Sequence, residues 1–245
     1  MEHVVGKRPV LEALRAGAAR EVLLATGSRS TGGLRDVLEA ADAAGIHVRR
    51  VAPEVVDQLA RGARHQGVAA PIRLPRPMNE QVLSRRRWAG DALVLILDGV
   101  TDPHNVGALA RTSEAAGAAA LVLRRRRGAG LSSVAVRASA GALLHLPVVE
   151  VANLVRAIER LRDRGFWVVA LDAGAEKVLF DHRPPPGPVA VVVGSEGQGV
   201  SRLAREACDD LVVIPLRGRV TSLNVSVAAG IALFELIRLR QRKES

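Results

Sequence analysis

Residues 191–201 have the sequence VVVGSEGQGVS, in which a run of valines ends in a loop containing three glycines. A buried strand that leads into a glycine-rich loop commonly binds phosphate, because the bare backbone N–H groups can approach the ligand closely. Glu196 lies within this loop, however, and its carboxylate would repel a pyrophosphate. The loop therefore suits a ligand without phosphate groups, or it is simply a tight turn.

The position of this loop argues against the common nucleotide-binding folds. A dinucleotide-binding fold carries its glycine fingerprint after the first strand, whereas this loop follows about the fifth strand of its domain. The chain also lacks the GxxxxGK[ST] pattern of nucleoside-triphosphate loops. S-adenosylmethionine, in which a sulfonium cation joins a nucleoside to an amino acid, fits a glycine loop that carries an acid. A nucleotide-dependent oxidoreductase is the weakest alternative.

Composition limits the class of protein. Apolar residues make up 48% of the 245 residues and charged residues 24%, as in ordinary globular proteins. The apolar runs at 92–97 and 189–193 are too short to span a bilayer, and the N-terminus lacks the apolar core of a signal peptide. The single cysteine, Cys208, excludes an internal disulfide, and no Cys/His cluster indicates a metal site. We therefore expect a soluble cytoplasmic protein without a metal.

The charge favours a nucleic-acid partner. Lys and Arg number 35 against 25 Asp and Glu, a formal charge of +10, and nearly all of the cations are Arg. Arg binds phosphate through two hydrogen bonds and stacks on bases, although a GC-rich genome would also enrich Arg. Residues 1–87 contain no aromatic side chain, so RNA contacts there would depend on charge and shape rather than on stacking.

Residues 1–74 form a small unit in which helices and strands alternate. We expect helices at 7–17, 31–44 and after Pro53, and strands at 21–25, 46–51 and 67–74. Residues 75–91 contain two prolines and four arginines with little periodicity, which indicates a linker.

The pattern restarts in residues 92–245, which we expect to form a second domain. Strands are predicted at 92–98, 119–123, 146–151, 166–172, 189–194 and 211–216, and a last helix at about 223–240. Unbroken apolar strands that alternate with helices predict an α/β fold, with a mostly parallel sheet buried on both faces.

Two more segments of this second domain carry polar residues at strand–helix junctions. Residues 97–118, LDGVTDPHNVGALARTSEAAGA, place a strand end before a helix that carries Asn105 and Arg111. Residues 214–235, IPLRGRVTSLNVSVAAGIALFE, place a strand and a basic loop before Ser222 and Asn224 at the start of a helix of small residues. Together with GSEGQG, these segments resemble, in order and spacing, the three signature motifs of the SpoU (TrmH-type) branch of the SPOUT RNA ribose 2′-O-methyltransferases.

The N-terminal part extends the resemblance over nearly the whole chain. GKRPVLEAL at 6–14 and HQGVAA at 65–70 are similar to the small RNA-binding domain of one subgroup, which methylates a guanosine in the peptidyl-transferase P loop of bacterial 23S rRNA. The resemblance implies a SPOUT α/β knot, in which the C-terminal segment is threaded into a deep trefoil. It also implies S-adenosylmethionine as cofactor, a homodimer formed through the catalytic domain, and 23S rRNA or a ribosome-assembly intermediate as partner.

The resemblance also implies roles for particular residues. The catalytic group falls on Asn105, Arg111, Glu196, Ser222 and Asn224. The cofactor, held largely by backbone groups, is expected at Gly194, Gly199, Ile214, Leu216 and Leu223.

Each polar residue of the catalytic group also has a simpler interpretation. Asn105, Ser222 and Asn224 could only cap helices, where these residue types are favoured. Arg111 could be a solvated helix residue, and Glu196 could pair with a neighbouring Arg and orient it.

Candidate RNA contacts outside the motifs rest on charge and position. The basic run at 124–128 follows a predicted strand, Arg217 and Arg219 precede the third motif, and the small domain offers a polar pair before its last strand. The candidates are Arg124, Arg125, Arg217, Arg219, His65 and Gln66. The simpler interpretation of Arg124 and Arg125 is a run of solvated charges. The simpler interpretation of His65 and Gln66 is an ordinary turn.

Two further features bear on mechanism and assembly. Cys208 lies near a predicted helix end without the setting of a nucleophile, which argues against methylation of a pyrimidine carbon through a covalent adduct. Val227, Ile231, Phe234 and Ile237 recur at helical spacing in the last helix, as in a core or a dimer interface.

The sequence leaves three functions open. The favoured one is 2′-O-methylation of a guanosine ribose in 23S rRNA. The second is the same chemistry on tRNA, and the third is a non-catalytic rRNA-binding or ribosome-assembly protein that binds no S-adenosylmethionine.

Overall fold

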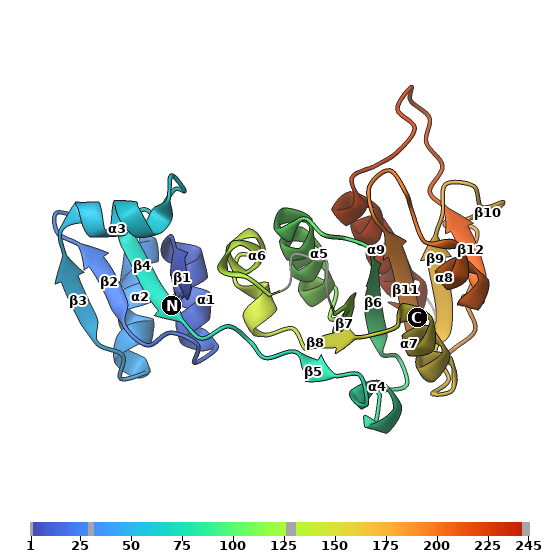
Figure 1. Ribbon diagram of the computed structural model, residues 1–245, viewed down its shortest axis with the longest axis horizontal. Helices are drawn as coiled ribbons and strands as arrows, with labels where there is room; N and C mark the ends of the chain where they lie inside the picture. Colours follow the sequence, from blue (N-terminus) through green and yellow to red (C-terminus); the bar gives the residue numbers. More distant parts are fainter. Residues whose placement is uncertain (1, 29–31, 126–130, 242–245) are drawn as a thin grey trace.

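The computed structural model describes residues 2–28, 32–125 and 131–241, which form two α/β units joined by an extended segment (Figure 1). The first unit has a four-stranded sheet in the order β1-β4-β2-β3, in which β2 and β3 run parallel and the other neighbours antiparallel. Its elements are β1 (Glu2–Val5), α1 (Lys7–Arg15), β2 (Val22–Ala25), α2 (Gly32–Ala43), β3 (Val48–Val51), α3 (Pro53–Ala60) and β4 (Val68–Ile72).

The second unit has an eight-stranded sheet in the order β10-β12-β9-β11-β6-β7-β8-β5, and all of its neighbouring strands are parallel. The strands are β5 (Met78–Asn79), β6 (Leu93–Asp98), β7 (Ala120–Arg124), β8 (Val148–Val151), β9 (Trp167–Leu171), β10 (Lys177–Val178), β11 (Val189–Gly194) and β12 (Asp210–Val213). The helices are α4 (Val82–Arg85), α5 (Pro103–Ala115), α6 (Ser133–Ala138), the 3-10 turn η1 (Ala142–Leu144), α7 (Leu154–Arg162), α8 (Arg202–Ala207) and α9 (Val225–Gln241).

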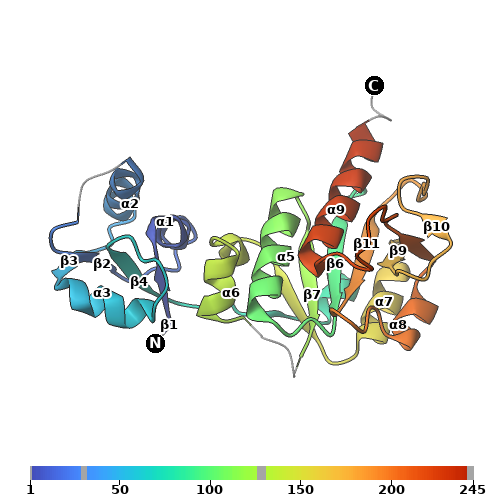
Figure 2. The ribbon, with the colours of Figure 1, turned by 90° about the horizontal axis from the view of Figure 1, so that it is seen from above.

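Alternate residues of the central strand β6 face opposite layers of this unit. Leu93, Leu95 and Leu97 pack in one cluster with residues of α5 and α9, whereas Val94 and Ile96 pack in another with residues of α7 and α8. Figure 2 shows the same division of the helices between the two sides of the strands. The sheet is buried on both faces, which confirms the prediction from its apolar strands.

Residues 75–91, expected to be a linker, take part in the second sheet. β5 pairs with β8, and Glu80 accepts a hydrogen bond from Ala152 N at 3.1 Å and pairs with Arg160 at 3.1 Å. Leu83 of α4 is fully buried against the layer that contains α7. β5 and β10 have only two residues each, which is too short to show a periodicity, and neither they nor β1 was predicted.

The two units touch where α1 meets the segment around η1. Glu12 Oε2 lies 3.1 Å from His145 Nε2. Gly141 has a φ of +95°, and a Cβ at this position would lie 2.3 Å from Glu12 Cβ. Glycine is therefore needed here twice, for its backbone conformation and for the close approach of the two units.

Candidate active site

Three connections meet at the carboxyl edge of the second sheet. They are the β6–α5 connection at 99–102, the β11–α8 connection at 195–201 and the β12–α9 connection at 214–224. Because the strands are parallel, their carboxyl ends lie along one edge, where α/β proteins place their ligands. The three predicted motifs therefore lie together in space.

Asn224 links residues from all three motifs through its side-chain amide. Its Nδ2 donates hydrogen bonds to Asn105 Oδ1 at 3.1 Å and to Glu196 Oε1 at 2.7 Å. Its Oδ1 accepts from Ser226 N at 2.9 Å and from Ser226 Oγ at 2.5 Å. Both amide protons and both lone pairs of the oxygen are thus used, which holds the amide in one orientation. Asn105, Glu196 and Asn224 form one polar cluster.

The helix-cap interpretation holds for only one of the two asparagines. Asp102 caps α5, because its side chain accepts from His104 N at 3.0 Å, and Asn105 lies inside the first turn. Asn224 does cap α9, because its Oδ1 accepts from Ser226 N, and both protons of its Nδ2 bind the cluster. Glu196 makes no ion pair with an arginine among the described residues, so its recorded side-chain partner is Asn224.

The loop after β11 is closed so tightly that one of its glycines has no room for a side chain. A Cβ on Gly194 would lie 1.9 Å from Gly199 C and 2.2 Å from Val200 N. Gly199 N donates to Ser195 O at 2.9 Å, and Gly197 and Gly199 have φ values of +85° and +66°. The loop is therefore a tight turn, and residues 196–199 are exposed at the edge of the sheet.

Asp98 supports this loop and was not predicted as a site residue. It ends β6, is only 6% exposed, and its Oδ2 accepts from Ser201 N at 2.7 Å. The bond joins the first and second motifs directly beneath the glycine loop. An acid at the end of the apolar run LVLILD is the sequence signal that could have identified it, because a buried carboxylate needs a partner.

The remaining catalytic and cofactor candidates surround the cluster without bonding to it. Arg111 on α5 and Ser222 before α9 are exposed, and neither makes a side-chain hydrogen bond to another described residue. Ile214 and Leu223 are partly buried, while Leu216 is 38% exposed.

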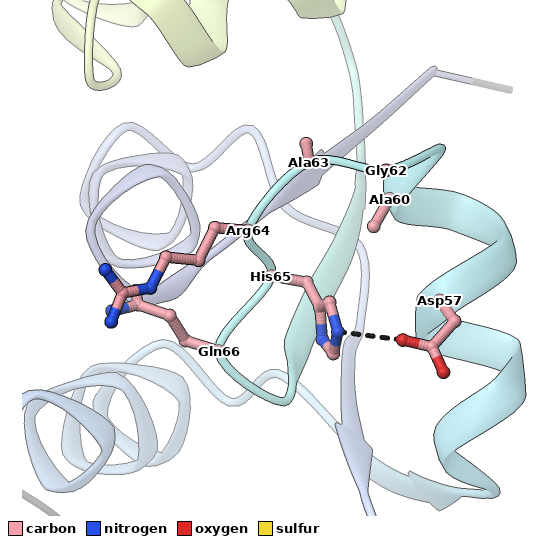
Figure 3. Close-up of a pocket in the computed structure, with 7 residues that line it drawn as sticks. All are labelled: Asp57, Ala60, Gly62, Ala63, Arg64, His65 and Gln66. Atoms are coloured by element: carbon pink, nitrogen blue, oxygen red, sulfur yellow. Dashed lines mark ion pairs between the residues drawn. The ribbon is translucent and has the colours of Figure 1, made fainter.

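The candidate RNA-binding arginines are exposed. Arg217 and Arg219 lie in the β12–α9 connection, which extends away from the body of the protein (Figure 1). Arg124 ends β7 and Arg125 follows it, at the same edge of the sheet. The rest of that basic run, 126–128, lies outside the described residues. His65 and Gln66 lie in the first unit and line a hollow between α3 and β4 (Figure 3).

Cys208 has the environment of an inert thiol. Its Sγ donates to Ala204 O at 3.0 Å, and burial raises the pKa of the thiol to about 12. This setting agrees with the prediction that Cys208 is not a nucleophile.

Within the part of the chain that the structure describes, His, Cys, Asp and Glu side chains do not gather in groups able to hold a metal ion. In the same ranges every helix is too short or too polar to span a bilayer.

Sequence comparisons match both units to known families. Residues 92–234 match the SpoU rRNA Methylase family, and residues 3–78 match the RNA 2′-O ribose methyltransferase substrate-binding family. The 23S rRNA (guanosine-2′-O-)-methyltransferase RlmB of Photobacterium profundum is 44% identical over 198 residues, which cover 80% of each chain. The putative TrmH family tRNA/rRNA methyltransferase YacO of Bacillus subtilis is 38% identical and covers 98% of this chain, with 96% of its own length matched.

Solved structures share the whole architecture. The SpoU methyltransferase AviRb from Streptomyces viridochromogenes, in complex with AdoMet, superposes with a TM-score of 0.78 at 27% identity, covering 98% of this chain and 90% of AviRb. The AdoMet-bound rRNA methyltransferase from Sinorhizobium meliloti gives a TM-score of 0.78 at 27% identity, covering 97% and 87%. The fold and the cofactor class expected from the sequence are confirmed, and the chain belongs to the SpoU rRNA methylase family.

Proposed function

We propose that this protein transfers a methyl group from S-adenosylmethionine to the ribose 2′-hydroxyl of a guanosine in 23S rRNA. The observation that carries the proposal is the Asn224 amide, which joins Asn105 of the first motif to Glu196 of the second from within the third. A structural cap would need only the bond from Ser226 N. The additional bonds order three loops at the ligand-binding edge of the sheet.

The residues at this edge fit S-adenosylmethionine in their chemistry. The exposed backbone of 196–199 offers hydrogen-bonding groups, and Ile214, Leu216 and Leu223 offer apolar surface for an adenine ring. We assign the contacts with the cofactor to these three residues together with Gly194 and Gly199. When bound, the cofactor supplies a methyl carbon on a sulfonium, which leaves as a neutral thioether. The proposal includes the trefoil knot that the family resemblance implies for the segment from β11 to α9.

Arg111 is assigned to the RNA rather than to proton abstraction. A guanidinium stays protonated in proteins and is not normally a base. Its fixed charge can bind the phosphate beside the reacting ribose and stabilise alkoxide character on the 2′-oxygen. The proton then passes to the phosphate or to water. Ser222 and the Asn224 cluster orient the ribose, and Glu196 is held by Asn224 for the same purpose.

The fraction of this chain that solved structures match favours rRNA over tRNA as the substrate. The Sinorhizobium meliloti rRNA methyltransferase matches 97% of this chain, whereas the Aquifex aeolicus TrmH/SpoU tRNA-modifying enzyme matches 67%, with a TM-score of 0.58. The additional first unit of this chain therefore resembles a part of the rRNA enzymes. Within 23S rRNA we propose the peptidyl-transferase P loop, free or in a ribosome-assembly intermediate.

We also propose a homodimer formed through the second unit. Val227 and Phe234 of α9 are each 50% exposed and lie seven residues apart, so they share one face of the helix. Exposed large apolar side chains on one helix face are typical of an interface.

Methyl transfer from labelled S-adenosylmethionine to a 23S rRNA fragment, followed by mapping of the modified ribose, tests the function. A guanosine 2′-O-methyl group in the rRNA is the expected product. Methylation of tRNA in place of rRNA would support the second hypothesis, and calorimetry without S-adenosylmethionine binding would support the non-catalytic one.

The role of Arg111 is tested by Arg111→Ala. Turnover should fall about 10²–10³-fold, as when one donor to a developing oxyanion is removed, while the affinity for S-adenosylmethionine stays the same. Arg164→Ala is a matched control, because Arg164 is exposed and lies at the opposite edge of the sheet, before β9. Equal losses of turnover and cofactor affinity in Arg111→Ala would contradict the assignment.

A further inference from the structure

The turn between α3 and β4, residues 61–67, has an unusual backbone. Among the described residues three non-glycine residues have a positive φ, and two of them, Arg61 at 48° and Gln66 at 55°, lie in this turn. Left-handed conformations cost free energy for residues with a Cβ, and they persist where the surroundings enforce them, often at functional sites. The contacts of the turn show what enforces them.

His65 is fully occupied by contacts within the protein. Its Nε2 lies 2.9 Å from Asp57 Oδ1 on α3, and its Nδ1 accepts from Gly67 N at 3.1 Å. Figure 3 shows the ring directed at Asp57, with the ion pair marked. Neither ring nitrogen remains to bind a base or a phosphate, so His65 has the environment of a residue that shapes the turn.

Gln66 is used in a similar way. Its Oε1 accepts from Lys7 N at 3.3 Å, at the start of α1. Gly6, with a φ of +96°, brings this helix end close, since a Cβ at Gly6 would lie 3.4 Å from Arg64 O and 3.7 Å from Gln66 Oε1. The turn is thus fixed to α3 on one side and to α1 on the other.

Two arginines of the same turn have no such contacts. Arg61 and Arg64 are exposed, and neither forms an ion pair or a side-chain hydrogen bond with another described residue. Figure 3 shows the Arg64 side chain extending from the side of the turn opposite to Asp57. Asp57, the one acid that lines the hollow, is already paired with His65. The turn therefore carries two arginines against one nearby carboxylate, a net positive charge.

The turn also faces the same side of the molecule as the candidate active site. In Figure 1 the segment after α3 rises on the upper side, as does the long β12–α9 connection that carries Arg217 and Arg219. The contact of Glu12 with His145 holds the two units in this arrangement. Both basic segments therefore lie on the same side of the molecule.

We infer that Arg61 and Arg64 bind phosphates of the substrate RNA, and that His65 and Gln66 are positioning residues that hold these arginines in place. The inference rests on the proposed function and replaces the expectation that His65 and Gln66 touch the RNA. It assigns an electrostatic role to the turn, in keeping with a unit that lacks aromatic side chains for stacking.

The test measures the binding of a 23S rRNA fragment by filter retention at several salt concentrations and at pH 8, where an ordinary histidine is neutral. Arg64→Ala should weaken binding about tenfold, as expected when one charge-assisted hydrogen bond is lost, and should lower the slope of log affinity against log salt by about 1. Arg61→Ala should act likewise. Arg20→Ala is the matched control, since Arg20 is exposed in the same unit but lies beside Pro71 at the other end of β4.

A double-mutant cycle distinguishes a positioning role of His65 from direct binding of His65 to RNA. His65→Ala should weaken binding and lower the salt slope, although it removes no positive charge, because a ring whose Nδ1 accepts a hydrogen bond is not doubly protonated. His65→Ala added to the Arg61→Ala/Arg64→Ala variant should then weaken binding no further, because the contacts that His65 positions are already lost. Effects that multiply would mean that His65 binds RNA independently, and would overturn its positioning role.

Further outcomes separate this inference from the proposed function. S-adenosylmethionine affinity, measured by calorimetry, should be unchanged in every variant, which also shows that the second unit is folded. Arg61→Ala and Arg64→Ala variants that bind RNA as well as Arg20→Ala does would overturn the inference, even if the wild-type protein methylates rRNA. Wild-type protein that binds the fragment through these arginines but transfers no methyl group would overturn the proposed function alone.

Discussion

Two turns of this protein are held in shape by opposite means. The β11–α8 turn closes because Gly194 lacks a Cβ, so that the backbone of Gly199 and Val200 fills the space where a side chain would be. The α3–β4 turn closes through side chains, with His65 bound to Asp57 and Gln66 bound to the start of α1. The first leaves its backbone exposed for a small ligand, and the second leaves its arginines exposed for a polyanion. The manner of closure thus corresponds to the type of ligand proposed for each turn.

Gly194→Ala should have the largest effect. The new Cβ would lie within 2.2 Å of backbone atoms that cannot rotate away, so the turn must open. We expect a loss of about 3 kcal/mol in the free energy of unfolding, at the upper end for overpacking, and no detectable S-adenosylmethionine binding in calorimetry. Gly90→Ala is the control, because a Cβ there meets nothing within 4 Å. Unchanged cofactor affinity in Gly194→Ala would show that the closed turn is not needed for binding.

Asp98→Ala should have the next largest effect. It leaves the Ser201 N–H without its acceptor beneath the same turn, and the loss of a hydrogen bond to a charged group costs about 1.5–3 kcal/mol. Affinity for S-adenosylmethionine should fall about tenfold, and RNA binding at the α3–β4 turn should not change. Asp98→Asn, which keeps an acceptor oxygen, should recover most of the loss. If Asn and Ala behave alike, the negative charge rather than the hydrogen bond is what matters.

The sequence predicted the parts of the fold that depend on long apolar periodicity. β6, β7, β8, β9, β11 and β12 all lie within the predicted strands or begin or end a residue outside them, because a strand buried on both faces is apolar throughout. β1, β5 and β10 were missed, since their pairing depends on partners far along the chain, such as Val149 for Met78. The residue pattern of a short strand does not indicate which distant strand it pairs with.

The same limit applies to the two turns. Three glycines and an acid made the β11–α8 turn visible in the sequence, although not the contact that excludes a Cβ from Gly194. The contacts that hold the α3–β4 turn join His65 to Asp57 of the preceding helix and Gln66 to Lys7, 59 residues away. They therefore had no local signal in the sequence. His65 and Gln66 were predicted as candidate RNA contacts, whereas in the structure their side chains contact Asp57, Gly67 and Lys7.

Gln66→Ala tests the second turn and should have a smaller effect than the changes near Gly194. The Lys7 N–H at the start of α1 loses its acceptor, which costs about 1 kcal/mol, as for other helix caps. The residue keeps a positive φ in either form, so backbone strain does not differ greatly. Urea denaturation should show the loss. Gln66→Glu should prevent it, because a carboxylate both accepts the hydrogen bond and favours a helix N-terminus. A stability of Gln66→Ala equal to that of the wild type would mean that other contacts hold the turn.

The rate at which the Cys208 thiol is labelled should show the smallest effect, and it compares the two turns directly. Burial raises the pKa of its thiol to about 12, so little of it is thiolate at pH 8 and labelling by a disulfide reagent should be slow. Cys208 directly follows α8, the helix that begins beyond the Asp98–Ser201 bond, so opening of the β11–α8 turn should expose it. Labelling should therefore accelerate in Asp98→Ala and stay at the wild-type rate in Gln66→Ala. Equal acceleration in both variants would mean that the two turns do not open independently, whereas separate rates would show that each unit keeps its own local stability.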